Sequence, residues 1–333
     1  MTMSGSATAG TTLGEASERE TLKQIFPRLP RSFATIVGPG DDAAVLAAPD
    51  GRYVVTTDMM VHGPDFRWAW SAPYDLGWKA AATNLSDVAA MGAVPTALVV
   101  AIAAPSDTPV ADLLSLADGL RDACAALAPD CGVVGGDLSV SGTFTIAVTA
   151  FGDLQGRRPV LRSGARAGDV VAVSGALGVA ATGLRLLFER AVDENGEPDR
   201  ARFEEVLREH PETVGAQLRP NPPIADGPLA ALAGATAMLD LSDGLALDAR
   251  RVAEDSGVAV DLESSALGDD VRTALTGGED HGLLATFPRG TALPGGFRPI
   301  GHVAAGSGLL VDGRLFEERG GWDPYVGWNG HAG

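Results

Sequence analysis

The chain has 333 residues, of which 25 are lysine or arginine and 43 are aspartate or glutamate, giving a formal net charge of −18. With 45% hydrophobic residues, it has enough apolar material for a folded core, and its length predicts about two domains. The acidic balance excludes non-specific nucleic-acid binding. No apolar run reaches the roughly 18 residues that would indicate a membrane span.

In chain order, an arm at 1–17 that is rich in Ser, Thr, Gly and Ala precedes alternating strands and helices. The arm shows no periodicity, which is typical of disorder. Continuous runs of β-branched residues predict strands, and apolar residues at helical spacing predict helices. The elements expected in the first half are a helix at 18–29, strands at 35–37 and 52–57, a helix at 74–91, a strand at 97–103, a helix at 110–127, and strands at 133–134 and 144–151.

A polar stretch at 152–158 predicts the boundary between an N-terminal domain (18–152) and a C-terminal domain (153–333). The proline-rich segment 219–223 is unsuited to a helix interior, and we expect a loop at 192–200. The other elements expected in this half are strands at 170–173, 238–241, 258–261 and 283–287, and helices at 177–189 and 245–254. The fold class predicted is therefore mixed α/β in two domains.

Several sequence patterns exclude other enzyme classes. Cys124 and Cys131 match no zinc or redox spacing, and the N-terminus lacks the pattern of a secretory signal, so we expect a cytoplasmic protein. Neither of the two lysines, Lys23 and Lys79, follows a glycine, so the sequence has no Walker A loop. The GxSxG and GxGxxG patterns are absent as well.

Acidic residues recur in six short segments, each flanked by Gly, Ser or Thr. In chain order they are Gly40-Asp41-Asp42, Thr56-Thr57-Asp58, Asn84-Leu85-Ser86-Asp87, Gly135-Gly136-Asp137, Asp240-Leu241-Ser242-Asp243-Gly244 and Gly277-Gly278-Glu279-Asp280. One such segment is typical of a turn or a helix cap. Gathered carboxylates without cations would repel by about 4 kcal/mol per pair at a separation of about 4 Å, whereas Mg²⁺ binds carboxylate and phosphate oxygens together. As a set, the segments predict a metal–phosphate site.

The same segments, in this order, resemble the thiamine-monophosphate kinases, whose superfamily includes aminoimidazole ribonucleotide synthetase. Arg162-Ser163-Gly164-Ala165 adds to the resemblance, which extends over about 18–325. It implies an N-terminal α/β domain whose sheet pairs with a partner's sheet in a homodimer, and a C-terminal α/β domain. It also implies direct in-line transfer of the ATP γ-phosphoryl group to thiamine monophosphate, with no covalent nucleophile.

The resemblance implies a role for each motif residue, with several Mg²⁺ ions as cofactors and ATP as co-substrate. The implied metal ligands are Asp42, Thr56, Thr57, Asp58, Asp87, Asp137, Asp240 and Asp243. The implied ATP contacts are Gly136, Asp137, Arg162 and Ser242. The implied contacts to thiamine monophosphate are Glu279, Tyr325 and, at a position that departs from the family, Asp65.

The departures from the family pattern lie on the acceptor side. Asp65 stands where a substrate-contacting histidine is usual, and His281-Gly282 replaces a tyrosine–glutamate pair. The segment 267–277 is also short. A carboxylate at Asp65 can hydrogen-bond the aminopyrimidine or face the thiazolium cation. Alternatively, it lies on a variable loop in solvent.

Two alternative functions remain open. One is another ATP-using member of the superfamily with a different acceptor. A selenophosphate synthetase should carry a reactive Cys or selenocysteine in its N-terminal arm, and a hydrogenase-maturation carbamoyl dehydratase should end in cysteine, whereas this arm has no Cys and the sequence ends in Gly333. The other alternative is a non-catalytic acidic protein that binds cations without turning over nucleotide.

Overall fold

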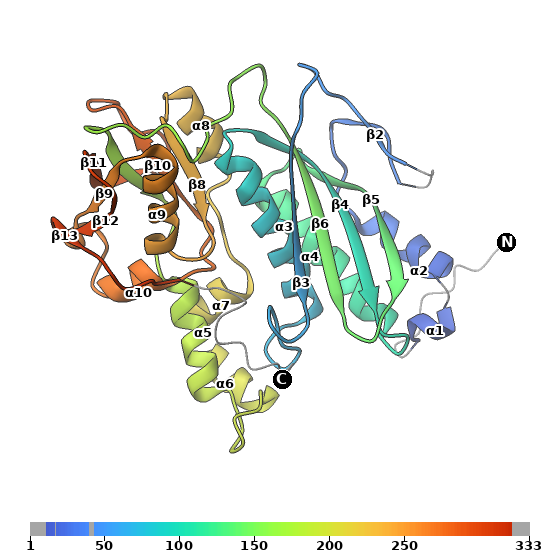
Figure 1. Cartoon of the computed structure of the whole chain (residues 1–333). Helices are drawn as coiled ribbons and strands as arrows, with labels where there is room; N and C mark the ends of the chain where they lie inside the picture. The colour runs from blue at the N-terminus through green and yellow to red at the C-terminus, as the bar shows by residue number, and fades with distance from the viewer. Residues whose placement is uncertain (1–10, 17, 40–42, 322–333) are drawn as a thin grey trace.

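The computed structural model describes residues 11–16, 18–39 and 43–321. These residues form two main sheets with their own helices, side by side in Figure 1. The mixed α/β, two-domain fold expected from the sequence is confirmed. Two of the predicted site residues, Asp42 and Tyr325, lie outside the described residues.

The N-terminal domain is built on a four-stranded sheet with the strand order β3-β6-β4-β5. Strand β6 runs antiparallel to both β3 and β4, and β5 runs parallel to β4. The four strands are β3 (Val54–Val61), β4 (Val94–Ala104), β5 (Gly132–Val140) and β6 (Thr145–Asp153). Helices α3 (Pro73–Ala90) and α4 (Val110–Leu127) cover one face of this sheet (Figure 1).

Two glycines let α3 and α4 approach closely. A Cβ atom on Gly77 would lie 2.0 Å from the Leu116 carbonyl oxygen, and one on Gly119 would lie 2.1 Å from the Tyr74 carbonyl oxygen. Both distances are far below van der Waals contact, so only glycine fits without moving a helix. This close packing holds α3, which carries much of the site, firmly on the sheet.

The N-terminal segment carries short elements beside this domain. The prediction that the arm 1–17 is disordered is wrong for its described part, because Leu13–Ala16 forms a helical turn, α1. Backbone N–H groups of Leu13 and Gly14 donate to the carbonyl oxygens of Thr108 and Ser106, which ties the turn to the domain. The following elements are α2 (Glu18–Ile25), the 3-10 helix η1 (Phe26–Arg28), β1 (Thr35–Val37) and β2 (Val45–Leu46).

The C-terminal domain is built on a seven-stranded sheet with the order β13-β12-β9-β11-β7-β10-β8. The strands are β7 (Val170–Ser174), β8 (Ala237–Leu241), β9 (Ala259–Leu262), β10 (Gly282–Phe287), β11 (Arg298–Ala304), β12 (Gly308–Val311) and β13 (Arg314–Leu315). The helices are α5 (Val179–Arg190), α6 (Arg200–Glu209), α7 (Pro211–Leu218), α8 (Asp226–Leu232), α9 (Leu245–Ser256), α10 (Val271–Thr276) and the 3-10 helix η2 (Ser264–Ala266).

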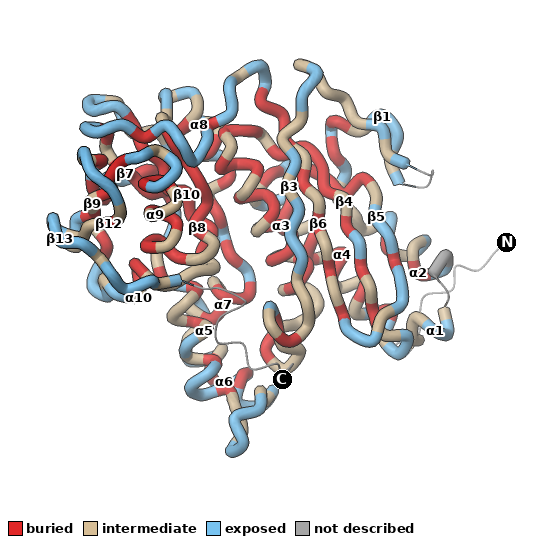
Figure 2. The backbone as a smooth tube through the Cα atoms, viewed as in Figure 1, coloured by how far each residue is buried: buried red, intermediate tan, exposed pale blue. Residues whose placement is uncertain are grey.

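Helix α3 lies where the two domains face each other. It packs on its own sheet and also contacts β8 and β10 of the other sheet. Figure 2 shows buried residues along α3 and along the strands of the C-terminal sheet. Strand β6 ends at Asp153 and β7 begins at Val170, so we retain the predicted boundary at 152/153 as a proposal. Among the described residues, no helix has the length and apolar character needed to cross a membrane.

Candidate active site

Helix α3 presents the first group of site residues. It begins with Pro73 at its first turn, and Asp75 accepts a hydrogen bond from the Ala72 N–H over 3.1 Å, which satisfies a free donor at the helix start. It ends just before Gly92, whose φ of +73° suits a residue without a Cβ atom. Between these ends, helical spacing places residues 79, 83, 86 and 87 near one another on one side.

Strand β3 meets this side of α3. The Thr56 hydroxyl donates to Asp87 Oδ2 over 2.8 Å, and the Asp58 N–H donates to Asn84 Oδ1 over 3.1 Å. Since side chains alternate along a strand, Thr56 and Asp58 both point toward α3. The predicted site residues Thr56, Asp58 and Asp87 therefore come together.

A third carboxylate arrives from the C-terminal domain. Asp240 is 5% exposed near the end of β8, and its Oδ2 accepts a hydrogen bond from the Ser86 hydroxyl over 3.1 Å. The His281 Nδ1 atom lies 3.3 Å from the same oxygen. These contacts join the two domains at the acidic cluster, by which we mean Asp58, Asp87 and Asp240.

The carboxylates of the acidic cluster disturb one another's ionisation. Loss of solvent, followed by the charges of Asp240 and Asp58, raises the pKa of Asp87 from 3.8 to about 7. Loss of solvent and the charge of Asp240 also raise the pKa of Asp58. Burial alone would lower the pKa of His281, but its contact with Asp240 and the charge of Glu279 outweigh burial and raise it. The cluster thus favours the binding of positive charge.

Asp243 lies beside this cluster, just before α9, and forms an ion pair with Arg251. Arg251 Nη2 lies 2.7 Å from Asp243 Oδ2, and its Nη1 lies 2.6 Å from Asp248 Oδ1. Asp248 is fully buried, and burial raises its pKa to about 7 despite the nearby Arg251. Asp248 Oδ2 also accepts the Gly244 N–H over 3.2 Å, so Arg251 and Asp248 fix the turn that carries Ser242 and Asp243.

The segment between α10 and β10 is held in an uncommon backbone conformation. Glu279 and His281 have φ values of +71° and +51°, which non-glycine residues rarely adopt. The Glu279 N–H donates to the Ser242 carbonyl oxygen over 2.9 Å. Asp280 accepts the N–H groups of Gly178 and Ala180 over 2.5 and 2.8 Å at the start of α5. These bonds aim Glu279 and His281 toward α3.

Opposite Glu279, α3 contributes a buried cation. Lys79 Nζ lies 2.5 Å from Glu279 Oε2, and the Lys79 and Glu279 side chains are 7% and 34% exposed. Burial would raise the pKa of Glu279, but the charge of Lys79 outweighs it and lowers the pKa. Loss of solvent and the charge of Glu279 raise the pKa of Asp65, so Asp65 lies within electrostatic range of this pair. The Asp65 Oδ2 atom also accepts the Val61 N–H over 2.6 Å.

Other predicted residues lie apart from the acidic cluster in the single chain. Thr57 and Asp137 point to the face of the N-terminal sheet opposite α3, because each alternates with a residue on the helix side. Gly136 lies next to Asp137 on β5, three strands away from β3. The Arg162 side chain is exposed in the linker between the domains.

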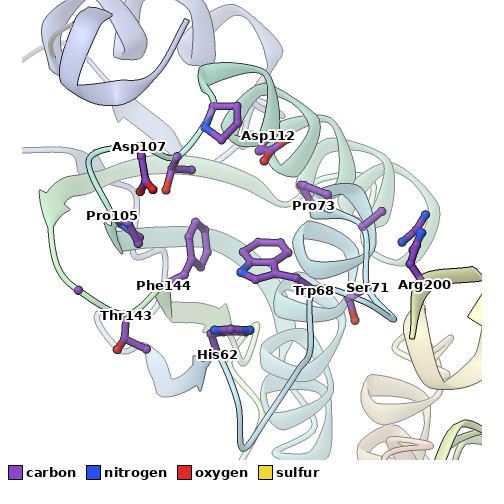
Figure 3. Close-up of a pocket in the computed structure, with 14 residues that line it drawn as sticks. His62, Trp68, Ser71, Pro73, Pro105, Asp107, Asp112, Thr143, Phe144 and Arg200 are labelled. Carbon is purple, nitrogen blue, oxygen red and sulfur yellow. The ribbon is translucent and has the colours of Figure 1, made fainter. Parts of the chain in front are cut away.

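A hollow of about 750 Å³ lies elsewhere, at the end of the N-terminal sheet (Figure 3). In Figure 3, Trp68 and Phe144 point into it, with Asp107 and Asp112 on one side. None of the predicted site residues lines this hollow. The chemistry of the acidic cluster, rather than the size of a cavity, locates the candidate active site.

Sequence reasoning missed several residues of the site. They are Lys79, Ser86, Asp248, Arg251 and, as a partner of Asp240, His281. Helical spacing gives a signal for two of them, because Lys79 and Ser86 are seven residues, or about two helical turns, apart on α3. The ion pairs of Arg251 and the contact of His281 depend on tertiary packing and carry no local signal.

The donor set fits Mg²⁺ bound together with phosphate. Within the described ranges, no three acidic, histidine or cysteine side chains are arranged to hold a metal ion by themselves. Mg²⁺ commonly takes one or two carboxylates and completes its shell with water and substrate phosphates. Asp58, Asp87 and Asp240 supply such carboxylates, while Asp42 lies outside the described residues.

Comparisons with known proteins show which proteins this chain is similar to. Residues 40–154 match the family model for the AIR synthase related protein, N-terminal domain, so this part of the chain is similar to that class of domain. It is 43% identical to a thiamine-monophosphate kinase of Mycobacterium tuberculosis, over 97% of this chain and 94% of that one. It is 40% identical to one of Corynebacterium glutamicum, over 88% of both chains.

A solved structure of AaThiL complexed with AMPPCP and TMP has a TM-score of 0.72 and 32% identity, covering 95% of this chain and 99% of that one. The chain belongs to the thiamine-monophosphate kinase family.

Proposed function

We propose that this protein transfers the γ-phosphoryl group of ATP to thiamine monophosphate, producing thiamine diphosphate. The observation that carries the proposal is the acidic cluster, in which carboxylates from β3, α3 and β8 lie close enough to raise the pKa of Asp58 and of Asp87, while Ser86 of α3 bonds Asp240 of the other domain. Family membership supports the same reaction, because the relatives named above are thiamine-monophosphate kinases. The AaThiL structure complexed with AMPPCP and TMP supports both substrates.

The residues of the site fit the needs of phosphoryl transfer. This reaction requires alignment and charge neutralisation more than covalent participation. When held by these carboxylates, Mg²⁺ would supply positive charge that neutralises the phosphates during transfer. In our proposal, Asp58, Asp87 and Asp240 hold the metal, Thr56 and Ser86 orient two of these carboxylates, and the acceptor phosphate needs no strong base.

Residues outside the acidic cluster keep the roles that the family motifs imply. Each of these roles is a proposal that rests on the residue's motif position rather than on a contact with the acidic cluster. The metal ligands among them are Asp42, Thr57, Asp137 and Asp243, the ATP contacts are Gly136, Asp137, Arg162 and Ser242, and the acceptor contacts are Asp65, Glu279 and Tyr325.

The direct test is ADP release by the wild-type protein with thiamine monophosphate, compared with thiamine and with other phosphate acceptors. We expect rapid ADP release from ATP only when thiamine monophosphate is the acceptor. ADP release with a different phosphate acceptor would instead indicate another member of the superfamily. Cation binding without any nucleotide turnover would indicate the non-catalytic alternative.

Asp65 provides a test of the acceptor side. Replacing Asp65 with alanine is expected to raise the KM for thiamine monophosphate by about three- to tenfold, which is the loss of one hydrogen bond. The KM for ATP should stay unchanged. Asp65→Asn is the matched control, since it keeps an acceptor for the Val61 N–H while removing the charge. An unchanged acceptor KM in both variants would make Asp65 a surface residue.

We also propose a homodimer formed through the open face of the N-terminal sheet. Helices cover only the other face, and Val55 and Met59, which alternate with Thr56 and Asp58 along β3, are 55% and 61% exposed on the open face. An apolar sheet face of this kind is typical of an interface.

We also propose that the protein is cytoplasmic. Its two cysteines are both free and buried, which is typical of a reducing compartment.

The expected result is a dimer mass in solution at micromolar concentration, measured by light scattering. Met59→Asp should shift the mass to the monomer because it places a charge on this face. Leu232→Asp is the control, because Leu232 is 67% exposed on α8 of the other domain. This variant should remain dimeric. A monomeric wild-type protein would contradict the proposal.

A further inference from the structure

Lys79 is a buried lysine that the reaction scheme above does not use. Its side chain is 7% exposed in the first half of α3. An ammonium group taken out of water is costly unless other groups pair with it. The partners of Lys79 therefore indicate its role.

The partners of Lys79 belong to the other domain. Its Nζ atom lies 2.5 Å from Glu279 Oε2. With the Gln217 amide oriented to satisfy both of its ends, Nζ also donates to the Gln217 oxygen over 3.1 Å, and the Gln217 nitrogen donates to the Ala180 carbonyl oxygen over 3.2 Å. Lys79 thus reaches from α3 to α7 and to the segment that carries Glu279.

The Glu279 side chain is more exposed to solvent than that of its partner Lys79. Its side chain is 34% exposed, and its backbone has a φ of +71°. Among the described residues, Lys79 is the cation that forms an ion pair with Glu279. Without Lys79, the Glu279 carboxylate would lose the contact that fixes its direction, and its partly exposed side chain would turn to solvent.

We propose that Lys79 is a positioning residue that holds the Glu279 carboxylate in place toward the acceptor, and so determines acceptor binding rather than ATP binding. The inference rests on the proposed function. Thiamine monophosphate offers an amino group on its pyrimidine and a cationic thiazolium, and an oriented carboxylate suits both.

The test is a double-mutant cycle read by steady-state kinetics on the full chain. The variants are Lys79→Met, Glu279→Gln and the double variant. Lys79→Met is expected to raise the KM for thiamine monophosphate by at least about tenfold while the KM for ATP stays within about twofold. In the Glu279→Gln background, the same change should add little, because Lys79 acts through Glu279.

The matched control is Lys23→Met, the same change at the other lysine, whose side chain is 58% exposed on α2. It should leave both KM values unchanged. AMPPCP binding by calorimetry checks that each variant is folded. Should Lys79→Met fail this check, Lys79→Arg is measured instead, and it should bind AMPPCP normally and keep the acceptor KM within about threefold of the wild-type value.

Three outcomes would overturn the inference. One is a loss of kcat in Lys79→Met with both KM values unchanged, and another is an effect that adds fully to that of Glu279→Gln. The third is a Lys79→Arg variant that binds AMPPCP normally but raises the KM for thiamine monophosphate by about tenfold or more, the change expected for Lys79→Met. The failure of the proposed function is distinct, since it would show as a wild-type protein that does not release ADP with thiamine monophosphate.

Discussion

Replacing Asp87 with asparagine is expected to lower kcat by about 10²- to 10³-fold, the loss typical of removing one electrostatic stabiliser of a transition state. The asparagine side chain would keep an oxygen for the Thr56 hydroxyl, so the local hydrogen bond survives while the charge is lost. Asp107→Asn is the control, because Asp107 is exposed on the turn before α4. Near-wild-type kcat at saturating Mg²⁺ would remove Asp87 from the metal site.

The same variant should be more stable than the wild type when divalent cations are absent. The pKa of Asp87 is about 7 in the folded chain, against 3.8 for the ordinary carboxyl group. The folded state therefore binds more protons, and the contribution of Asp87 to stability falls as pH rises from about 4 to about 7. At pH 8 in chelator, Asp87→Asn should show a higher Tm than the wild type by calorimetry. A lower Tm would show that the carboxylate does not strain the apo fold.

Removal of divalent cations is expected to abolish turnover. The acidic cluster repels the phosphates of ATP unless cations neutralise it. ADP release with thiamine monophosphate should fall to background in excess chelator and return when Mg²⁺ or Mn²⁺ is added beyond the chelator. Undiminished turnover in chelator would contradict the metal site. A chain treated with chelator and then returned to Mg²⁺ controls for irreversible unfolding.

Much of the fold could be predicted from local pattern. Helix α3 was expected at 74–91 and is found at Pro73–Ala90, and α4 was expected and found at 110–127. Both are 18 residues long and carry apolar residues along much of their length, which makes a helix predictable from sequence. Helices α6 and α7 were missed because their buried residues, such as Phe203 and Val214, form a small separate cluster with α5. Helix α6 has ten residues and α7 has eight, so each offers few apolar positions from which a helix could be predicted.

The acidic segments and the apolar elements beside them could be identified from local pattern, because turn chemistry and strand or helix periodicity are local properties. Which of these residues lie together depends on the packing of the two domains. The tertiary structure joined Asp87 to Asp240 through Ser86, and it placed Thr57 and Asp137 on the other face of the sheet. It also paired Lys79 with Glu279 across 200 residues of sequence. Such pairings follow from the packing of two domains around α3, which no local spacing encodes.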